Sequence, residues 1–135
     1  TNMFGDILTD EAAGLVGGLG MAPGLSVGRG HIAMAQATHG SAPDIAGQGI
    51  ANPYAMVEST RMLLDWLGQA RAIPAANTAA QLMLNGIEAA LADPASRTPD
   101  IRGTGSQRNM VEASWPICQP EYPTAEGAKV FRVRP

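Results

Sequence analysis

The stretch that most limits the fold of this 135-residue chain runs from Gln36 to Pro53. Glycine and proline interrupt it too often for a regular helix, and Ile45 and Ile50 are too few large apolar residues for a buried strand. We therefore predict a long loop whose small side chains let a ligand approach the backbone closely. Asn52 and Pro53 then predict a helix start, with Asn52 as N-cap and Pro53 at the first helical position.

Such a loop has two interpretations. A small-residue loop that ends at a helix N-terminus suits a nucleotide, with His39, Ser41, Asp44 and Asn52 as its polar groups. The other interpretation is a surface loop whose glycines and prolines serve only to make turns. The residue types by themselves leave both interpretations open.

The order of these residues resembles a known coenzyme loop. The run His39-Gly-Ser-Ala-Pro-Asp-Ile-Ala-Gly47, followed by Ile50-Ala-Asn-Pro53, is similar to that of the β-decarboxylating dehydrogenases, the isocitrate and 3-isopropylmalate dehydrogenase family. The resemblance implies an α/β fold, the C-terminal portion of an isopropylmalate dehydrogenase-like subunit, that is not a Rossmann domain and holds NAD mainly on loops. The cofactor-binding residues that it implies are His39, Gly40, Ser41, Ala42, Asp44, Ile45 and Asn52.

The same resemblance implies a choice of coenzyme at Asp44. Members that use NAD place an aspartate there to accept hydrogen bonds from the adenosine ribose, whereas members that use NADP typically place Lys-Tyr there. The pair in this chain is Asp44-Ile45, and a carboxylate repels a 2′-phosphate. We therefore expect NAD to be preferred over NADP.

Two aspartates near the N-terminus form the second candidate site. Asp6 and Asp10 are four residues apart, so both carboxylates lie on one face of the expected helix. Their spacing fits ordinary acids in a first helical turn as well as ligands of Mg²⁺ or Mn²⁺. The run from Asn2 to Asp10 resembles the family's metal motif, which implies that both bind the cation and that a partner subunit completes the site.

The remaining pattern predicts a few helices on a few strands. A stripe of apolar residues at helical spacing, Met56, Leu63 and Leu67, favours a helix whose buried face excludes Glu58. Gly68 is predicted to be the C-cap of this helix. Arg102 stands where the family has a glycine, which leaves any cofactor contact from its loop in doubt. The expected elements are a strand end at 1–4, helices at 6–16, 53–67, 74–91 and 106–115, a loop at 21–30, a buried strand at 31–35 and a turn-rich loop at 98–103.

Composition limits the partners and the compartment. A net charge of −3 and the absence of an apolar run near the ~20 residues that span a bilayer argue against nucleic acid and membrane. Cys118 is the single cysteine, which fits a reducing cytoplasm. The family implies a homodimer or higher oligomer and a small 2-hydroxy acid as substrate.

The sequence also predicts what this chain lacks. It starts without Met, and residues 1–115 resemble the last part of a family subunit, while 116–135 match nothing in it. The family's catalytic Tyr and Lys and its substrate arginines have no counterpart, so we expect no catalytic residue in this chain and no activity from it alone. The complete protein is expected to be an NAD- and metal-dependent decarboxylating dehydrogenase. The alternatives are a non-catalytic nucleotide-binding or regulatory paralogue and a truncated fragment.

Overall fold

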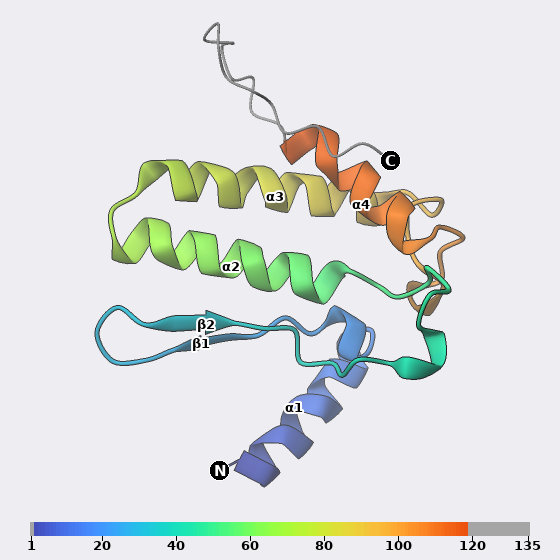
Figure 1. Cartoon of the computed structure of the whole chain (residues 1–135), viewed down its shortest axis with the longest axis horizontal. Helices are drawn as coiled ribbons and strands as arrows, with labels where there is room; N and C mark the ends of the chain where they lie inside the picture. Colours follow the sequence, from blue (N-terminus) through green and yellow to red (C-terminus); the bar gives the residue numbers. More distant parts are fainter. Residues whose placement is uncertain (1, 119–135) are drawn as a thin grey trace, which may run out of the picture.

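A hairpin and three helices form stacked layers, and a fourth helix projects from them (Figure 1). The computed structural model describes residues 2–118. The helices are α1 (Asn2–Val16), α2 (Tyr54–Ala70), α3 (Pro74–Ala92) and α4 (Gln107–Cys118), the strands are β1 (Leu25–Val27) and β2 (Ala33–Ala35), and the 3₁₀ turns are η1 (Leu19–Met21), η2 (Pro43–Ile45) and η3 (Pro99–Ile101). Helix α2 is the central layer because it contacts α3 on one side and the hairpin on the other.

Small residues bring α2 and α3 close together. Ala80 and Ala90 of α3 are almost fully buried. Gly68 is buried inside α2, and a side chain added there would collide with Asn77 of α3. The prediction that Gly68 is a C-cap is therefore wrong, because α2 continues to Ala70. The glycine instead allows α3 to pack closely against α2.

The buried face of α2 also differs from the predicted stripe. Met56 is 51% exposed, whereas Glu58 is 9% exposed and forms an ion pair with Arg61, with 2.8 Å between Oε1 and Nη2. The two residues are three apart, so their side chains meet on one helix face. Glu58 can be buried because the guanidinium neutralises and hydrogen-bonds it. Burial raises the pKa of the neighbouring Tyr54 hydroxyl, and the Glu58 carboxylate raises it further.

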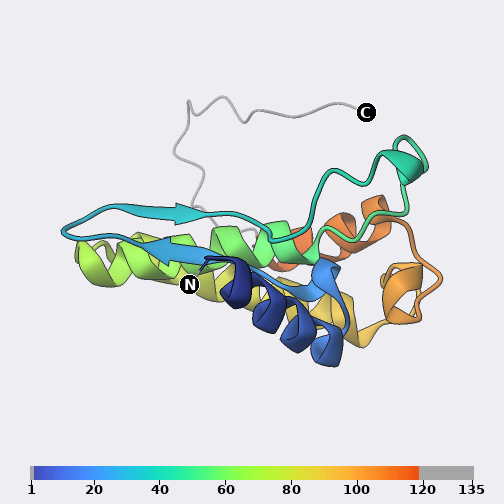
Figure 2. The same cartoon turned by 90° about the horizontal axis from the view of Figure 1, so that it is seen from below.

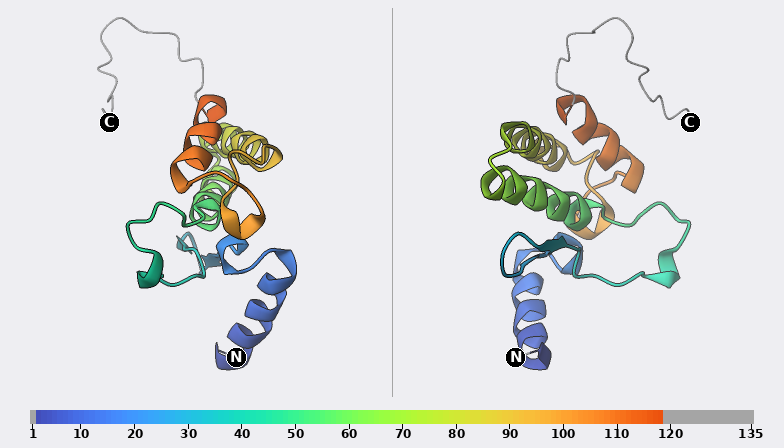
Figure 3. Two further views of the ribbon diagram at one scale, coloured as in Figure 1. Left: turned by 90° about the vertical axis from the view of Figure 1, so that its right-hand side faces the viewer. Right: turned by 60° about the vertical axis from the view of Figure 1, so that its left-hand side comes forward.

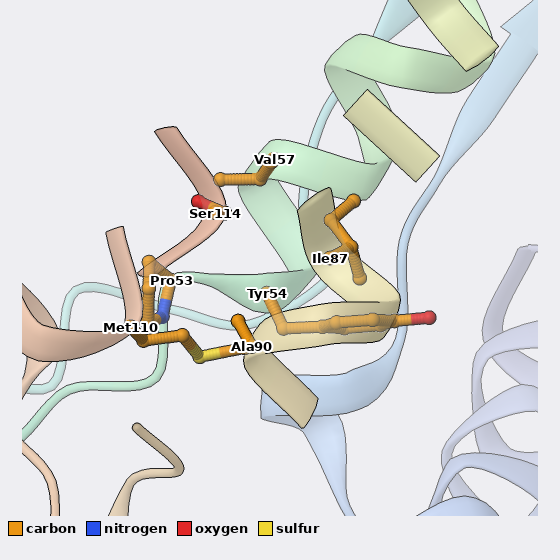
Figure 4. A pocket seen from close by; sticks show the side chains of 7 residues that line it. All are labelled: Pro53, Tyr54, Val57, Ile87, Ala90, Met110 and Ser114. Atoms are coloured by element: carbon orange, nitrogen blue, oxygen red, sulfur yellow. The ribbon is translucent and has the colours of Figure 1, made fainter. Parts of the chain in front are cut away.

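A small gap remains between α2, α3 and α4. Its volume is about 10 Å³, which is room for roughly one water molecule. Figure 4 shows the side chains around it, which are Pro53, Tyr54, Val57, Ile87, Ala90, Met110 and Ser114. This gap is an imperfection of core packing and is too small for a ligand.

The hairpin lies along α2 in the views of Figure 1 and Figure 2. Strand β1 falls in the 21–30 segment that was expected to be a loop, and it pairs antiparallel with β2, with Ser26 opposite Met34. The strand predicted at 31–35 is shorter and is not buried, because Met34 is 58% exposed while its neighbours in β2 are half-buried. Only one face of this two-stranded sheet is covered, so alternate residues stay exposed.

Both terminal helices differ from the prediction at their ends. Helix α1 begins at Asn2 rather than after a strand end at 1–4, and Gly5 lies inside it. The sheet found within residues 2–118 consists of β1 and β2, and residues 2–4 pair with neither. Ser106 caps α4 as predicted, with its Oγ 3.2 Å from the Asn109 nitrogen. The helix passes Pro116 to Cys118, since proline removes one hydrogen bond and need not end a helix so near its terminus. The segment 119–135 is outside the described residues.

Candidate functional site

The 36–53 loop projects from the helical layers, as Figure 3 shows. It holds one 3₁₀ turn, η2, and otherwise neither helix nor strand, as predicted. Ala42 has a φ of 45°, and Gly47 and Gly49 have φ values of 78° and 67°. The left-handed region favours glycine, so these positions explain why the loop needs small residues. Its far end is anchored where the Gln107 N–H donates to the Gly49 carbonyl at 2.7 Å.

An open cavity of about 460 Å³ lies against this loop. That volume is in the range of small-molecule sites. Its lining residues are Leu19, Gly20, His39, Gly40, Ser41, Ala42, Ile45, Ile50, Ala51, Asn52 and Asp100. The structure thus gathers around one cavity all the predicted cofactor-binding residues except Asp44.

Asp44 is exposed and lies outside the cavity lining. Its backbone carbonyl accepts a hydrogen bond from Gln48 Nε2 at 2.8 Å, which stabilises the turn after η2. Within residues 2–118 its carboxylate has no hydrogen-bond or ion-pair partner, and the next residue, Ile45, lines the cavity.

His39 has a defined tautomer in this loop. Its Nδ1 lies 2.9 Å from the carbonyl oxygen of Gly40. Because a carbonyl can only accept, Nδ1 carries the proton and Nε2 is the acceptor. His39 therefore offers a ligand an acceptor nitrogen when the imidazole is neutral.

Asn52 joins the loop to helix α2 and to a distant turn. Its Oδ1 accepts the Tyr54 N–H at 2.9 Å. The prediction that Asn52 is the N-cap and Pro53 the first helical residue is wrong by one position, because α2 begins at Tyr54 and Pro53 is its N-cap. Its Nδ2 donates to Asp100 Oδ2 at 2.9 Å and also lies 3.4 Å from Met21 Sδ. The sequence interpretation named neither Asp100 nor Gly20 as a site residue.

The turn that carries Asp100 ends at Arg102. Arg102 has a φ of 61°, and its N–H donates to the Pro99 carbonyl at 3.1 Å. The arginine thus adopts the left-handed conformation that a glycine would adopt more easily. The resemblance of 98–103 to a family segment was the signal that could have identified Asp100.

The two candidate metal ligands lie on α1. Asp6 and Asp10 are both exposed, and neither has an ion-pair partner within the described part of the chain. Asp10 also lines a wide groove of about 570 Å³ between α1 and the residues that lead into β1, whereas Asp6 does not. No group of three or more His, Cys, Asp or Glu side chains that could hold a metal occurs among residues 2–118. Two unpaired carboxylates one turn apart fit a divalent cation only if further ligands come from elsewhere.

Similarity to known proteins extends over most of the chain. The sequence profile of isocitrate/isopropylmalate dehydrogenase matches residues 1–114. The chain belongs to this family. It is 46% identical over 113 residues to an isocitrate/homoisocitrate dehydrogenase of Thermus thermophilus, covering 84% of this chain and 31% of that protein. It is 40% identical over 112 residues to a mitochondrial NAD isocitrate dehydrogenase catalytic subunit of Arabidopsis thaliana, covering 83% of this chain and 28% of that one.

The fold of this family member agrees with a solved structure. The isocitrate dehydrogenase of Methylococcus capsulatus superposes with a TM-score of 0.73 at 40% identity, covering 87% of this chain and 33% of that chain. The predicted isopropylmalate dehydrogenase-like α/β fold is confirmed. The chain spans about a third of the length of the relatives it matches. None of the helices in the described part is long and apolar enough to cross a bilayer.

Proposed function

We propose that the complete protein carries out NAD- and Mg²⁺- or Mn²⁺-dependent oxidative decarboxylation of a 2-hydroxy acid of the isocitrate, homoisocitrate or 3-isopropylmalate type. One observation carries the proposal: in a member of this dehydrogenase family, six of the seven residues expected to bind coenzyme line a single cavity of ligand size. The NAD-dependent relative from Arabidopsis thaliana supports the choice of coenzyme. As in the family, the working assembly is at least a homodimer.

Each part of the chain has its own task in this proposal. The cavity wall binds the adenosine half of the coenzyme, with His39 and Asn52 as the polar groups of the wall. Asp44, next to the lining residue Ile45, accepts from the ribose hydroxyls and disfavours a 2′-phosphate. Asp6 and Asp10 are two ligands of the cation, which when bound supplies Lewis-acid stabilisation of the developing enolate. Bound NAD would supply the hydride acceptor for the substrate carbon, and the general acid and base lie outside this chain.

The coenzyme assignment is tested by dinucleotide titration. We expect the chain to bind NAD more tightly than NADP, and Asp44→Asn to reduce that preference by about tenfold, because removal of the carboxylate charge abolishes its repulsion of the 2′-phosphate. Isothermal titration of both dinucleotides against both proteins measures the ratio, and E88Q on α3 serves as a control far from the loop in sequence. A wild-type chain that prefers NADP contradicts the assignment.

The metal assignment has a separate readout. Asp6→Asn and Asp10→Asn each remove one carboxylate charge, so we expect each to weaken Mn²⁺ binding, measured as the loss of free-ion signal in electron paramagnetic resonance. Glu11→Gln is the matched control because Glu11 is adjacent in the same helix and is not in the motif. Equal affinity in all four proteins argues against a site at these aspartates. Turnover by the 135-residue chain alone would contradict the view that its catalytic groups lie elsewhere.

A further inference from the structure

Three segments far apart in the sequence meet at one side of the coenzyme cavity. Gly20 comes from η1, Asn52 from the residues before α2, and Asp100 from η3, and all three line the cavity. A Cβ atom added to Gly20 would lie 3.2 Å from Asp100 Oδ2 and 3.4 Å from Asn52 Cβ. A side chain at position 20 would therefore press on both partners, and the glycine leaves room for the hydrogen bond between Asn52 and Asp100.

That hydrogen bond determines which way the Asn52 amide points. Its Oδ1 accepts the Tyr54 N–H and its Nδ2 donates to Asp100 Oδ2, each at 2.9 Å. A flipped amide would place its NH₂ group against the Tyr54 N–H and its oxygen against a carboxylate. Both contacts would then be repulsive, because a donor faces a donor and an acceptor faces an acceptor. The two partners thus select one orientation.

The turn around Asp100 is itself held in place by backbone hydrogen bonds. The N–H groups of Ile101 and Gly103 both donate to the Thr98 carbonyl, at 3.2 Å and 3.0 Å, and Thr98 is fully buried. The Asp100 carboxylate therefore extends from a turn that is held by hydrogen bonds on both sides of it.

We infer that Asp100 is a positioning residue: it orients the Asn52 amide so that the coenzyme site selects a 6-aminopurine over a 6-oxopurine. The inference rests on the proposed function. Beyond these two contacts, the amide retains one Oδ1 lone pair, and its second Nδ2 hydrogen faces only the Met21 thioether sulfur at 3.4 Å, a weak acceptor that a ligand nitrogen can replace. Asn pairs with adenine by accepting from the 6-amino group and donating to a ring nitrogen. Hypoxanthine carries an oxygen at that position, so it needs the flipped amide that Asp100 disfavours.

The test uses two readouts on the 135-residue chain and on its D100A, D100N and D100S variants. The first readout needs no ligand: the side-chain amide resonances of Asn52 in a proton–nitrogen correlation spectrum. The second is the ratio of dissociation constants for NAD and nicotinamide hypoxanthine dinucleotide, measured by calorimetry. E88Q is the control, and circular dichroism checks that each variant folds, with D100S replacing D100A if D100A is unfolded.

We expect wild type and E88Q to bind NAD about tenfold more tightly than the hypoxanthine analogue. D100A and D100S should shift the Asn52 amide resonances and reduce that ratio by about threefold or more, while D100N keeps most of it because its amide oxygen can still accept from Nδ2. Unchanged resonances and an unchanged ratio in D100A or D100S overturn the inference. If no protein binds either dinucleotide, the proposed function fails for this chain, and the amide resonances alone decide whether Asp100 orients Asn52.

Discussion

Arg102 shows how a single residue can occupy a conformation that does not suit it. Its left-handed backbone, with a φ of 61°, costs an L-residue about 1–2 kcal/mol. Replacement by glycine relieves this strain, but part of the gain in stability is lost because glycine has greater conformational freedom in the unfolded chain. We expect Arg102→Gly to raise the free energy of unfolding by about 0.5–1 kcal/mol, measured by urea denaturation. Ala89→Gly in the exposed face of α3 should lower it by about 1 kcal/mol. Loss of stability in both variants would contradict the assigned strain.

The ion pair between Glu58 and Arg61 is the other test at the residue scale. Their side chains are 12% and 18% exposed, so Glu58→Ala leaves a largely buried guanidinium without its partner. We expect the free energy of unfolding to fall by about 2 kcal/mol. In the matched exposed pair, Arg108 and Glu112 are 4.0 Å apart and 76% and 64% exposed, so Glu112→Ala should change it by less than about 0.5 kcal/mol. Equal losses of unfolding free energy in the two variants would show that burial does not determine how much an ion pair contributes to stability.

At the scale of elements, the contact between α2 and α3 depends on the absence of a side chain at Gly68. Alanine has a helix propensity about 1 kcal/mol better than glycine, yet a Cβ at position 68 would lie 2.9 Å from the Asn77 backbone nitrogen. We expect Gly68→Ala to lower the free energy of unfolding by about 1–3 kcal/mol. In Gly14→Ala nothing lies within 4 Å of the added Cβ, so the change should be stabilising by up to about 1 kcal/mol. Denaturation of both variants by urea decides the sign of each effect.

At the scale of the whole molecule, α1 is poorly covered. Ala13 is the only buried residue among its described residues 2–16, whereas Phe4, Leu8 and Leu15 are 62%, 71% and 90% exposed. Clustered exposed apolar side chains favour association. We expect the 135-residue chain to self-associate as its concentration rises, and Phe4→Ser with Leu8→Ser to suppress this in sedimentation velocity runs. Leu82 and Leu84 of α3 are half-buried, so serine at both of these positions should instead unfold the protein.

The amino-acid sequence determined the elements whose signals are local. The Ser106 cap and the glycine-rich loop depend on neighbours a few residues away, and both lie where they were predicted, while the start of α2 lies one residue after its predicted position. Two contiguous runs, 2–10 and 39–53, carried the resemblance to the family, and the family profile matches residues 1–114.

Only the tertiary structure decided the rest, because it depends on which distant residues meet. Gly68 ends no helix since Asn77 packs against it, and Glu58 can be buried since Arg61 pairs with it. Strand β1 exists because β2 lies beside it, which no local pattern shows. Asp100 joins the site across 48 residues of sequence through one hydrogen bond to Asn52. Contacts of that separation leave no periodicity or spacing in the sequence, so they become visible only when the chain is folded.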